Sequence, residues 1–285
     1  MAAAMGISEN VSSGDSGDSL AVDEADFGID ATSVQANADS PFATGIGGTS
    51  TFLSPNNNIE LETGWGLNET RIADPTPNPP VIPPLQLGFV FGAGGGVSGV
   101  YAKPAFQKGL PGSFRLVPDV SMNADPETGS EIIVTPDSVP GDPQEVAVFG
   151  GTSLSCPMFS GLWAIANQAA GVPLGQAAPY MYKLHGAAIT DVTDLTLVSL
   201  LNVFGIVIDP PTPIVIESPN SLAAPLENTK NYVSALFQSS TSTRWDVFTF
   251  GTDSSLTVGL GWDDVTGVGT PNGVPFIEQV VALAK

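Results

Sequence analysis

The sequence predicts an α/β domain whose largely parallel β-sheet is flanked by helices. Short apolar segments at Ile7–Ser12 and Glu145–Phe149 are typical of strands, and a long helical segment, Cys156–Ala170, follows the second of them. Strands that alternate with helices are typical of parallel sheets. The 285 residues are 42% hydrophobic and only 13% charged, so the chain can build a sizeable core.

The elements before the long helix are marked by short apolar runs and by turn residues. Residues 1–6 are expected to end a helix, and a tight polar loop, Ser13–Asp18, follows the first strand. Residues 54–84 are rich in Asn, Pro and Thr and are expected to be irregular, and Gly92–Gly96 is expected to form a turn. Further strands are expected at Pro41–Gly48, Leu85–Phe91 and Arg115–Ser121.

The long helix is the clearest element of the chain. Pro157 suits its first turn, and Gly171 ends it. Its apolar side chains leave little polar surface, so we expect the helix to be buried; among them are Phe159, Trp163 and Ile165. The elements that follow are a short helix, a variable segment and a closing amphipathic helix, at Pro179–Leu184, about 194–250 and Pro275–Leu283.

The charge balance excludes two classes of partner. The chain has 29 acidic and 8 basic residues, a formal charge of −21, which repels nucleic acid and anionic membranes. Such an excess suits either an acidic medium, where carboxylates are protonated, or high salt, where repulsion is screened. The apolar stretch Leu195–Ile208 is too short to span a bilayer, and Met1–Ile7 lacks the features of a signal peptide.

Ser153 is the first candidate for chemistry. It lies between an apolar strand and the long helix, so its hydroxyl is expected beside free backbone amides that can stabilise an oxyanion. The same position also suits an ordinary helix N-cap. A nucleophilic serine needs a base. The one histidine, His185, is either such a base or a residue that ends a helix, and the one cysteine, Cys156, is expected to be a small packing residue.

Two other patterns are set aside. Gly94–Gly99 fits the dinucleotide-binding spacing, but Pro104 follows soon afterwards and no helix opens there. Asp26 and Asp30 are spaced by one helical turn, but a glycine separates them. Neither pattern predicts a site.

The segment Gly150–Pro157 resembles the nucleophile segment of the sedolisins, the serine-carboxyl peptidases. Five further segments resemble that family in the same order along the chain. They are Ser12–Gly17, Ser40–Thr49, Gly94–Ser98 together with Pro104–Gln107, Val117–Pro126 and Gly261–Asn272. The resemblance implies that residues 1–285 are part of one peptidase domain, with a variable insertion at about 194–250.

The resemblance implies a subtilisin-like α/β fold and the hydrolysis of protein or peptide substrates at acidic pH. It implies that Ser153 is the nucleophile and that Asp15 belongs to the oxyanion hole, where a neutral carboxylic acid donates a hydrogen bond. In isolation, Asp15 would be read as a turn residue that bonds its own backbone. The base in this family is a glutamate, supported by an aspartate, which accepts a proton in acid, where histidine is already protonated.

The resemblance also implies one structural calcium ion. Its ligands would be the carboxylates of Asp191 and Asp263 and the carbonyl oxygens of Val192, Gly259 and Gly261. Calcium prefers such hard oxygen ligands.

Only 14 residues precede Asp15, whereas the glutamate and aspartate of the family lie far upstream of that position. We therefore expect an N-terminally truncated domain whose base lies in a missing segment, and this 285-residue chain is expected to be inactive by itself. The missing N-terminal half is then an expected partner, and the intact protein is expected to be extracellular. The alternative is a catalytically inactive remnant, or a calcium-binding interaction module of the same fold.

Overall fold

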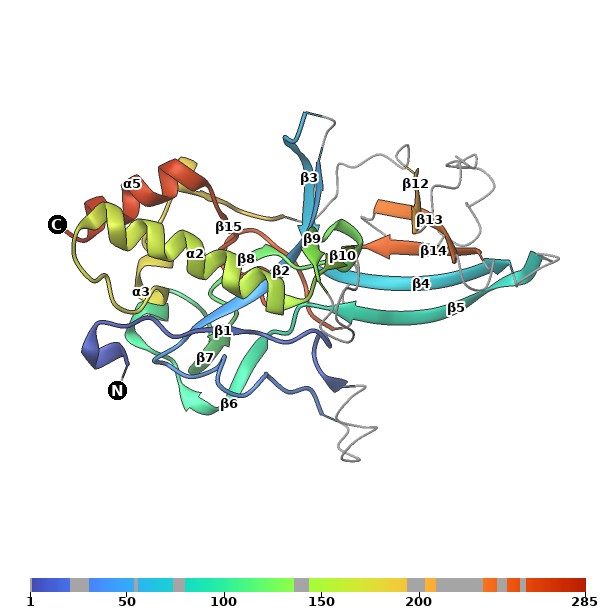
Figure 1. Ribbon diagram of the computed structural model, residues 1–285. Coiled ribbons are helices and arrows are strands. Elements are labelled where there is room, and N and C mark those ends of the chain that lie inside the picture. Colours follow the sequence, from blue (N-terminus) through green and yellow to red (C-terminus); the bar gives the residue numbers. More distant parts are fainter. Residues whose placement is uncertain are drawn as a thin grey trace.

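The computed structural model describes residues 2–20, 31–53, 56–73, 80–135, 144–193, 203–208, 233–239, 245–251 and 255–285 (Figure 1). Asp26, Asp30 and most of 194–250 lie outside these residues. Four short 3-10 turns accompany the main elements, at Ala3–Met5, Ala105–Gln107, Pro126–Thr128 and Gly186–Ala188.

The central sheet is built around β2 (Thr44–Leu53). β1 (Asn10–Ser12) and β8 (Val120–Asn123) lie parallel to its first half, and β3 (Ile59–Gly64) pairs antiparallel with its second half. Gly47 has no space for a Cβ atom, because one would lie 2.4 Å from the carbonyl oxygen of Val265. The predicted parallel pairing is confirmed here, and the strand expected at Pro41–Gly48 begins at Thr44.

The long helix α2 (Thr152–Ala170) covers one face of this sheet together with α5 (Gly273–Leu283). Phe159 lies between the two helices and is in ring contact with Trp163 and Phe276. The hydroxyl of Ser155 donates to the Gly47 carbonyl (2.6 Å) and accepts from the Met122 amide (3.0 Å). These two hydrogen bonds fasten the helix to β2 and β8.

The prediction of a fully buried helix is wrong for one face of α2. Phe159, Trp163 and Ala166 are buried, but Ile165 is 51% exposed. The helix also begins at Thr152, four residues before the predicted start, and ends at Gly171 as expected. The short helix α3 (Ala178–Met181) follows it.

Several strand predictions need correction. The strand expected at Arg115–Ser121 is two strands, β7 (Phe114–Val117) and β8, separated by the cis peptide bond Val117–Pro118. The prediction that residues 54–84 are irregular is wrong, since they contain β3, β4 (Gly66–Ala73) and the start of β5 (Pro80–Gly92). The remaining strands are β6 (Gly96–Ala102), β9 (Ser130–Val134), β10 (Glu145–Phe149), β11 (Ile189–Thr190) and β15 (Thr270–Pro271).

A second, five-stranded sheet joins two segments that are far apart in the sequence. Its order is β12 (Val203–Ile208), β13 (Val233–Ser239), β14 (Trp245–Phe250), β4 and β5. The Arg71 guanidinium on β4 forms an ion pair with Asp246 on β14 (3.2 Å). Phe250 packs edge-on against Phe52 at the end of β2. The described part of the 194–250 segment is therefore paired with the rest of the domain.

The glycine-rich segment Gly92–Gly96 serves close packing. A Cβ atom at Gly94 would overlap the carbonyl oxygen of Ser13, and one at Gly95 would overlap that of Asp264. Strand β6 opens at Gly96, so no helix follows the glycines. This agrees with setting aside the dinucleotide-binding pattern.

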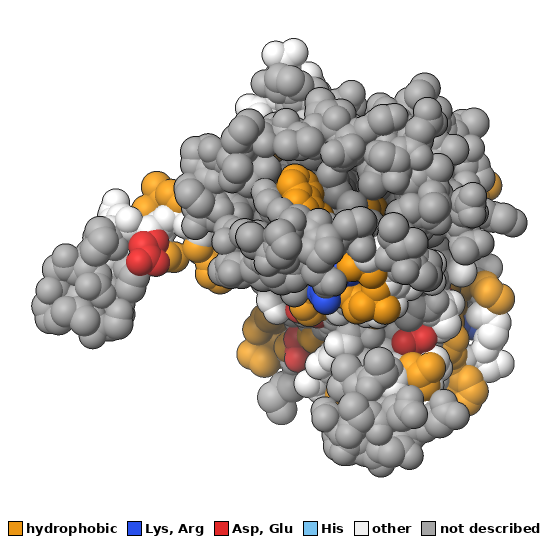
Figure 2. Space-filling view, turned by 90° about the vertical axis from the view of Figure 1, so that its right-hand side faces the viewer, with side chains coloured by type: hydrophobic (Ala, Val, Ile, Leu, Met, Phe, Trp, Pro, Cys, Tyr) orange, Lys and Arg blue, Asp and Glu red, His pale blue; other side chains and the backbone are white. Residues whose placement is uncertain are grey.

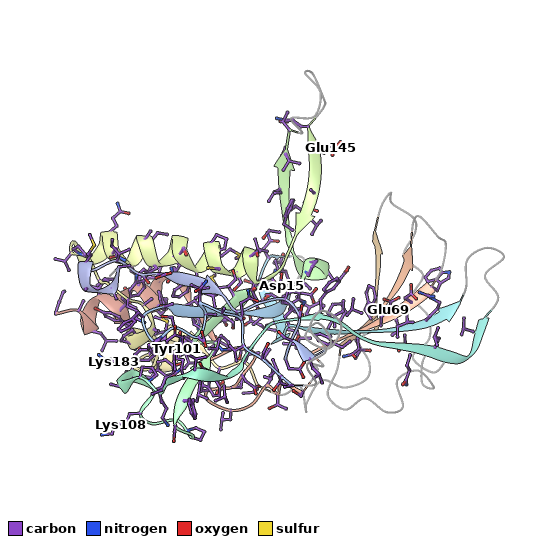
Figure 3. The ribbon with its side chains drawn as sticks, turned by 90° about the horizontal axis from the view of Figure 1, so that it is seen from below. Asp15, Glu69, Tyr101, Lys108, Glu145 and Lys183 are labelled. Atoms are coloured by element: carbon purple, nitrogen blue, oxygen red, sulfur yellow. The ribbon has the colours of Figure 1, made fainter. Side chains whose placement is uncertain are left out.

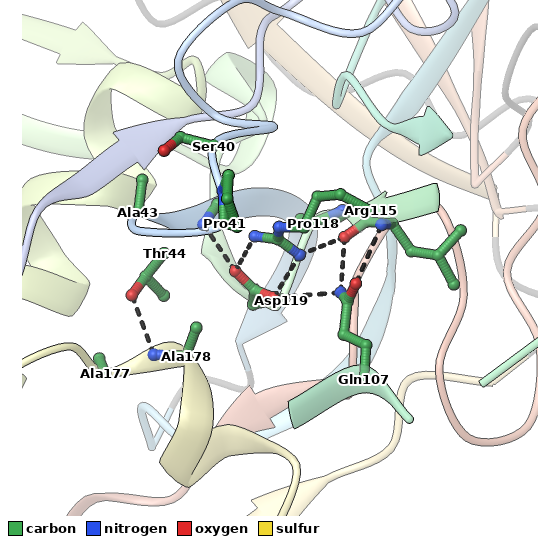
Figure 4. Close-up of polar contacts among 12 residues, drawn as sticks. Ser40, Pro41, Ala43, Thr44, Gln107, Arg115, Pro118, Asp119, Ala177 and Ala178 are labelled. Carbon is green, nitrogen blue, oxygen red and sulfur yellow. Dashed lines mark hydrogen bonds and ion pairs between the residues drawn. The ribbon is translucent and has the colours of Figure 1, made fainter. Parts of the chain in front are cut away.

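A buried ion pair joins β7 and β8 to the neighbouring elements (Figure 4). Arg115 and Asp119 are both fully buried, and the guanidinium nitrogens lie 2.7 and 2.5 Å from the two carboxylate oxygens. The carboxylate also accepts from the Tyr182 hydroxyl (2.7 Å) and from the Gly45 amide on β2 (2.8 Å). Gln107 donates to the Tyr182 oxygen (2.7 Å). Burial, followed by the charge of Asp119, raises the pKa of Tyr182 well above its usual value.

Candidate functional site

The first candidate site lies at the N-terminus of α2. Strand β10 ends at Phe149, and two glycines lead into the helix. Gly151 is the N-cap residue and has φ of +82°, a conformation that favours glycine. Ser153 is the second residue of the helix and is exposed. The interpretation of Ser153 as the N-cap is therefore wrong, and its hydroxyl is open to an incoming molecule.

Asp15 lies directly against this helix start, although 137 residues separate it from Thr152 in the sequence. Its Oδ1 accepts hydrogen bonds from the Thr152 amide (2.7 Å) and the Thr152 hydroxyl (2.8 Å). A Cβ atom at Gly151 would lie 2.8 Å from Asp15 Oδ2, so the N-cap position has no room for a larger residue. The interpretation of Asp15 as a turn residue that bonds its own backbone is not what the structure shows.

The loop that carries Asp15 is fixed on both sides. On the helix side, the Ser12 hydroxyl donates to the Thr152 carbonyl (3.0 Å), and the Gly14 amide donates to the Thr152 hydroxyl (3.2 Å). On the other side, the Gly92 amide at the end of β5 donates to the Asp15 carbonyl (3.1 Å), and the Gly17 amide donates to the Gly92 carbonyl (3.0 Å). The carboxyl group of Asp15 is thereby held beside the residue that precedes Ser153.

This arrangement suits acyl transfer. The exposed Ser153 hydroxyl stands at a helix N-terminus, where the helix dipole favours negative charge. Asp15 uses Oδ1 to accept from Thr152, and within the described residues its Oδ2 has no hydrogen-bond partner. When the carboxyl group is protonated, Oδ2 can donate a hydrogen bond to an anion formed near Ser153.

His185 is not brought to this site. It is exposed, it follows α3, and its amide donates to the Gln279 side chain on α5 (2.8 Å). α3 and α5 lie beside the C-terminal part of α2, whereas Ser153 is at its start (Figure 1). Cys156 is half-buried, and burial raises the pKa of its thiol, as expected of a packing residue.

Sequence reasoning missed a pair of acidic residues behind the site. Asp125 is fully buried and accepts from the Ser50 hydroxyl (2.6 Å) and the Glu127 amide (2.9 Å). Burial raises the pKa of Asp125 to about 6, and burial together with the nearby Asp125 raises the pKa of Glu127 to about 7. The Gly151 amide donates to the Ala124 carbonyl (2.5 Å), so this acidic segment supports the loop before Ser153. In the sequence, the acidic pair could have been noticed from Asp125-Pro126, which follows the strand expected at Arg115–Ser121.

Asp125 makes the stability of the domain depend on pH. The pKa of its carboxyl group is about 6 in the folded protein, against the ordinary aspartate value of 3.8 in the unfolded chain. The folded state therefore binds the proton more tightly than the unfolded chain does. The stabilisation is complete below pH of about 4 and is lost as the pH rises through about 6. Its upper bound is about 3 kcal/mol, from a shift of about two pKa units.

As this stabilisation is lost, the free energy of unfolding falls between pH 4 and pH 7. We expect Asp125→Asn to make that fall smaller by up to about 3 kcal/mol, as measured by urea denaturation at both pH values. Glu131→Gln, at an exposed residue, is the control. An unchanged pH dependence in Asp125→Asn would show that another group is responsible.

The segments predicted to hold calcium meet in the structure. Asp191 Oδ2 accepts from the Gly261 amide (2.8 Å), and the Gly259 amide approaches Asp263 Oδ2 (3.4 Å). Asp191 Oδ1 is buried and, among the described residues, has no hydrogen-bond partner. Val192 is buried beside it. A buried carboxylate oxygen without a partner is a suitable ligand for a cation.

The carboxylate of Asp263 is engaged by its own turn. Its Oδ1 accepts from the amides of Val265 (2.9 Å) and Thr266 (2.7 Å), and its Oδ2 accepts from the Thr266 hydroxyl (2.8 Å). Burial raises its pKa to about 6. In the part of the chain that the structure describes, no three His, Cys, Asp or Glu residues form a metal-binding group. A calcium ion here would therefore be coordinated largely by backbone carbonyl oxygens and by the carboxylate of Asp191.

Curated proteins similar to this chain include several peptidases. Kumamolisin of Bacillus sp. (strain MN-32) is 32% identical over 202 residues, which are 68% of this chain and 31% of kumamolisin. Sedolisin of Pseudomonas sp. (strain 101) is 33% identical over 185 residues, 64% of this chain and 27% of that protein. Human tripeptidyl-peptidase 1 is 31% identical over 112 residues, 35% of this chain and 20% of that protein. The chain thus matches about a third or less of the length of these relatives. No protein-family model matches the sequence.

A solved structure of Pseudomonas sedolisin, a serine-carboxyl proteinase complexed with two molecules of pseudo-iodotyrostatin, has a similar fold. The TM-score is 0.59 at 23% identity, and the similarity covers the whole of this chain and 58% of that one. The predicted α/β, subtilisin-like fold is confirmed. Among the helices within the described ranges, none has the length and apolar character needed to cross a membrane.

Proposed function

Because about two thirds of the chain is related to the sedolisins, we propose that it carries the nucleophile of a serine-carboxyl endopeptidase that hydrolyses peptide bonds at acidic pH. The hydrogen bonds from Thr152 to Asp15 carry this proposal, since they hold a carboxyl group beside the start of the helix that presents Ser153. Protein or peptide substrates and an extracellular location belong to the same proposal.

In the proposed reaction, the Ser153 hydroxyl attacks the carbonyl carbon of the peptide bond. A glutamate outside these 285 residues takes the proton and later gives it to the leaving amine. The oxyanion accepts hydrogen bonds from the neutral carboxyl group of Asp15 and from the Ser153 amide. Water then attacks the acyl-enzyme and releases the second product. Asp15 acts in this proposal as a neutral carboxylic acid that donates a hydrogen bond.

The test compares the 285-residue chain with a longer polypeptide that includes the residues encoded upstream. We expect no turnover of denatured protein by the shorter chain in acid, and turnover by the longer one. Ser153→Ala should lower that turnover by at least about 10³-fold. Ser160→Ala, on the same helix, should leave it unchanged. Turnover that persists in Ser153→Ala would contradict the proposed nucleophile, and a longer polypeptide without turnover would favour the inactive remnant.

We propose further that Asp191, Val192, Gly259, Gly261 and Asp263 hold one structural calcium ion. The buried, unpartnered Oδ1 of Asp191 supports this, because a bound cation would neutralise it. Calcium at a hundredfold excess over its Kd should stabilise the fold by about 2.7 kcal/mol and raise the Tm. Thermal melting in calcium and in chelator measures the effect, and magnesium is the control. Asp191→Ala should abolish the difference. An identical Tm in calcium and in chelator would exclude a structural ion.

A further inference from the structure

Strands β9 and β10 form a hairpin, here called the arm (Ser130–Val134 and Glu145–Phe149). Their antiparallel register is regular, from Ser130↔Phe149 to Val134↔Glu145. Neither strand pairs with any other strand of the described chain. In Figure 3 the arm stands off the body of the molecule, with Glu145 near its far end, and Figure 2 shows it in profile.

Both faces of the arm carry exposed apolar side chains, with one exposed glutamate on each: Glu131 on one face and Glu145 on the other. Paired residues share a face, so Ile133, Val146 and Val148 lie together, and these side chains are 69%, 68% and 56% exposed. Ile132 and Phe149 lie on the opposite face and are also exposed. A hairpin that only met solvent would place polar residues on its outer face. A two-stranded hairpin is marginally stable alone, and its free edges are templates for a further strand.

The root of the arm is fixed next to the candidate nucleophile. Phe149 is the last residue of β10, and Ser153 follows it by four positions. A Cβ atom at Gly150 would lie 2.5 Å from the Pro126 nitrogen, and one at Gly129 would overlap the Phe149 carbonyl. The root of the arm, where Phe149 and Gly150 meet residues 126–129, is therefore closely packed. A chain lying along β10 would run towards the start of α2.

We propose that the arm binds an extended, apolar segment of the polypeptide substrate, which adds as a strand to the free edge of β10. This inference rests on the proposed peptidase function and names its substrate class: unfolded segments with apolar side chains on both faces of the strand. Main-chain hydrogen bonds to β10 would supply affinity, and the exposed side chains of both faces would select apolar residues. A second copy of the chain is the competing occupant, and the experiment below includes an outcome that identifies it.

The proposal is tested by peptide binding, which does not require turnover. The probe is a fluorescent peptide of about ten residues in the repeating order Val-Val-Thr-Thr, which places Val on both faces of a strand and has the length of a long strand. The matched peptide has Pro in place of each Thr, which removes the N–H donors of those residues and prevents continuous strand pairing. Fluorescence anisotropy in acid measures the Kd for the full 285-residue chain and its variants.

We expect Val146→Lys combined with Val148→Lys to weaken binding of the Val-Thr peptide by about tenfold or more, equivalent to about 1.4 kcal/mol. Both side chains are exposed, so the fold should survive, and thermal melting verifies this. Val100→Lys, at a residue on β6 that is 77% exposed, is the matched control and should bind as the wild type does. The Pro-containing peptide should not bind.

Three results would overturn the proposal: unchanged affinity in the double-lysine variant, equal binding of the two peptides, or a wild-type dimer in sedimentation that the lysines disrupt while no peptide binds. Ser153→Ala should bind the peptide as the wild type does. Failure of the peptidase proposal is therefore seen in the turnover experiment alone, and failure of the arm proposal in the binding experiment alone.

Discussion

Asp119→Ala is expected to lower the free energy of unfolding by about 3–5 kcal/mol. Arg115 and Asp119 are both fully buried and face each other through two short contacts. Removing the carboxylate leaves the guanidinium charged in an apolar interior, where desolvation is not compensated. It also leaves the Gly45 amide without its acceptor. Urea denaturation of the 285-residue chain measures the change.

Two further variants separate charge from packing. Tyr182→Phe removes one hydroxyl from the same cluster and should cost only about 1–2 kcal/mol, because the ion pair remains. Adding Arg115→Met to Asp119→Ala should recover part of the loss, because no buried charge is then left unpaired. A loss below about 1 kcal/mol in Asp119→Ala would show that water reaches Arg115 or that the cluster rearranges.

Asp15→Ala is expected to lower the kcat of the longer polypeptide by about 10²–10³-fold, the usual effect of removing one oxyanion-hole donor. KM should change little, because the donor acts on charge that develops in the transition state. The helix also loses an acceptor for the Thr152 amide, which costs about 1 kcal/mol of stability. Kinetics in acid, together with thermal melting of the same variants, separates the two effects.

Asp15→Asn is the matched variant. An amide oxygen can still accept from Thr152, and an amide N–H can donate at any pH, so this variant should keep more activity than Asp15→Ala. Donation to the oxyanion should also no longer depend on protonation at this position. If Asp15→Ala lost stability but kept its kcat, the residue would be only a structural support for α2.

The parts of the fold that were predicted from the sequence are those with local signals. Helix α2 has an apolar face and a glycine at its end, and both lie within one segment. The prediction that Pro157 lies in the first turn is wrong, because the helix begins at Thr152 and Pro157 lies inside it. The exposed Ile165 was misjudged because a run of apolar residues does not show which face a helix buries. The strand before α2 was also found, since its apolar run ends at two glycines, Gly150 and Gly151.

The five-stranded sheet was missed because its pairing is not local. β4 and β5 contain prolines, polar residues and shifts of register, so their segment has no alternating pattern. The second partner of β4 is β14, where Asp246 lies 175 positions from Arg71, and no local pattern predicts which strands meet at that distance. The contact of Asp15 with Thr152 is of the same kind. It was expected only from the resemblance of ordered segments to a known family, since Asp15 alone indicates a turn.

The five-stranded sheet has a consequence for engineering this domain. β4 is an interior strand between β14 and β5, and β5 ends at the Gly92 backbone that holds the Asp15 loop. Trimming the segment around 203–250 to obtain a shorter domain would remove the strand that pairs with one edge of β4 and leave Arg71 without its Asp246 partner. In the sequence, this segment looks like an insertion that could be removed. In the structure, its strand β14 pairs with β4, β4 pairs with β5, and the end of β5 is hydrogen-bonded to the loop of the proposed oxyanion residue Asp15.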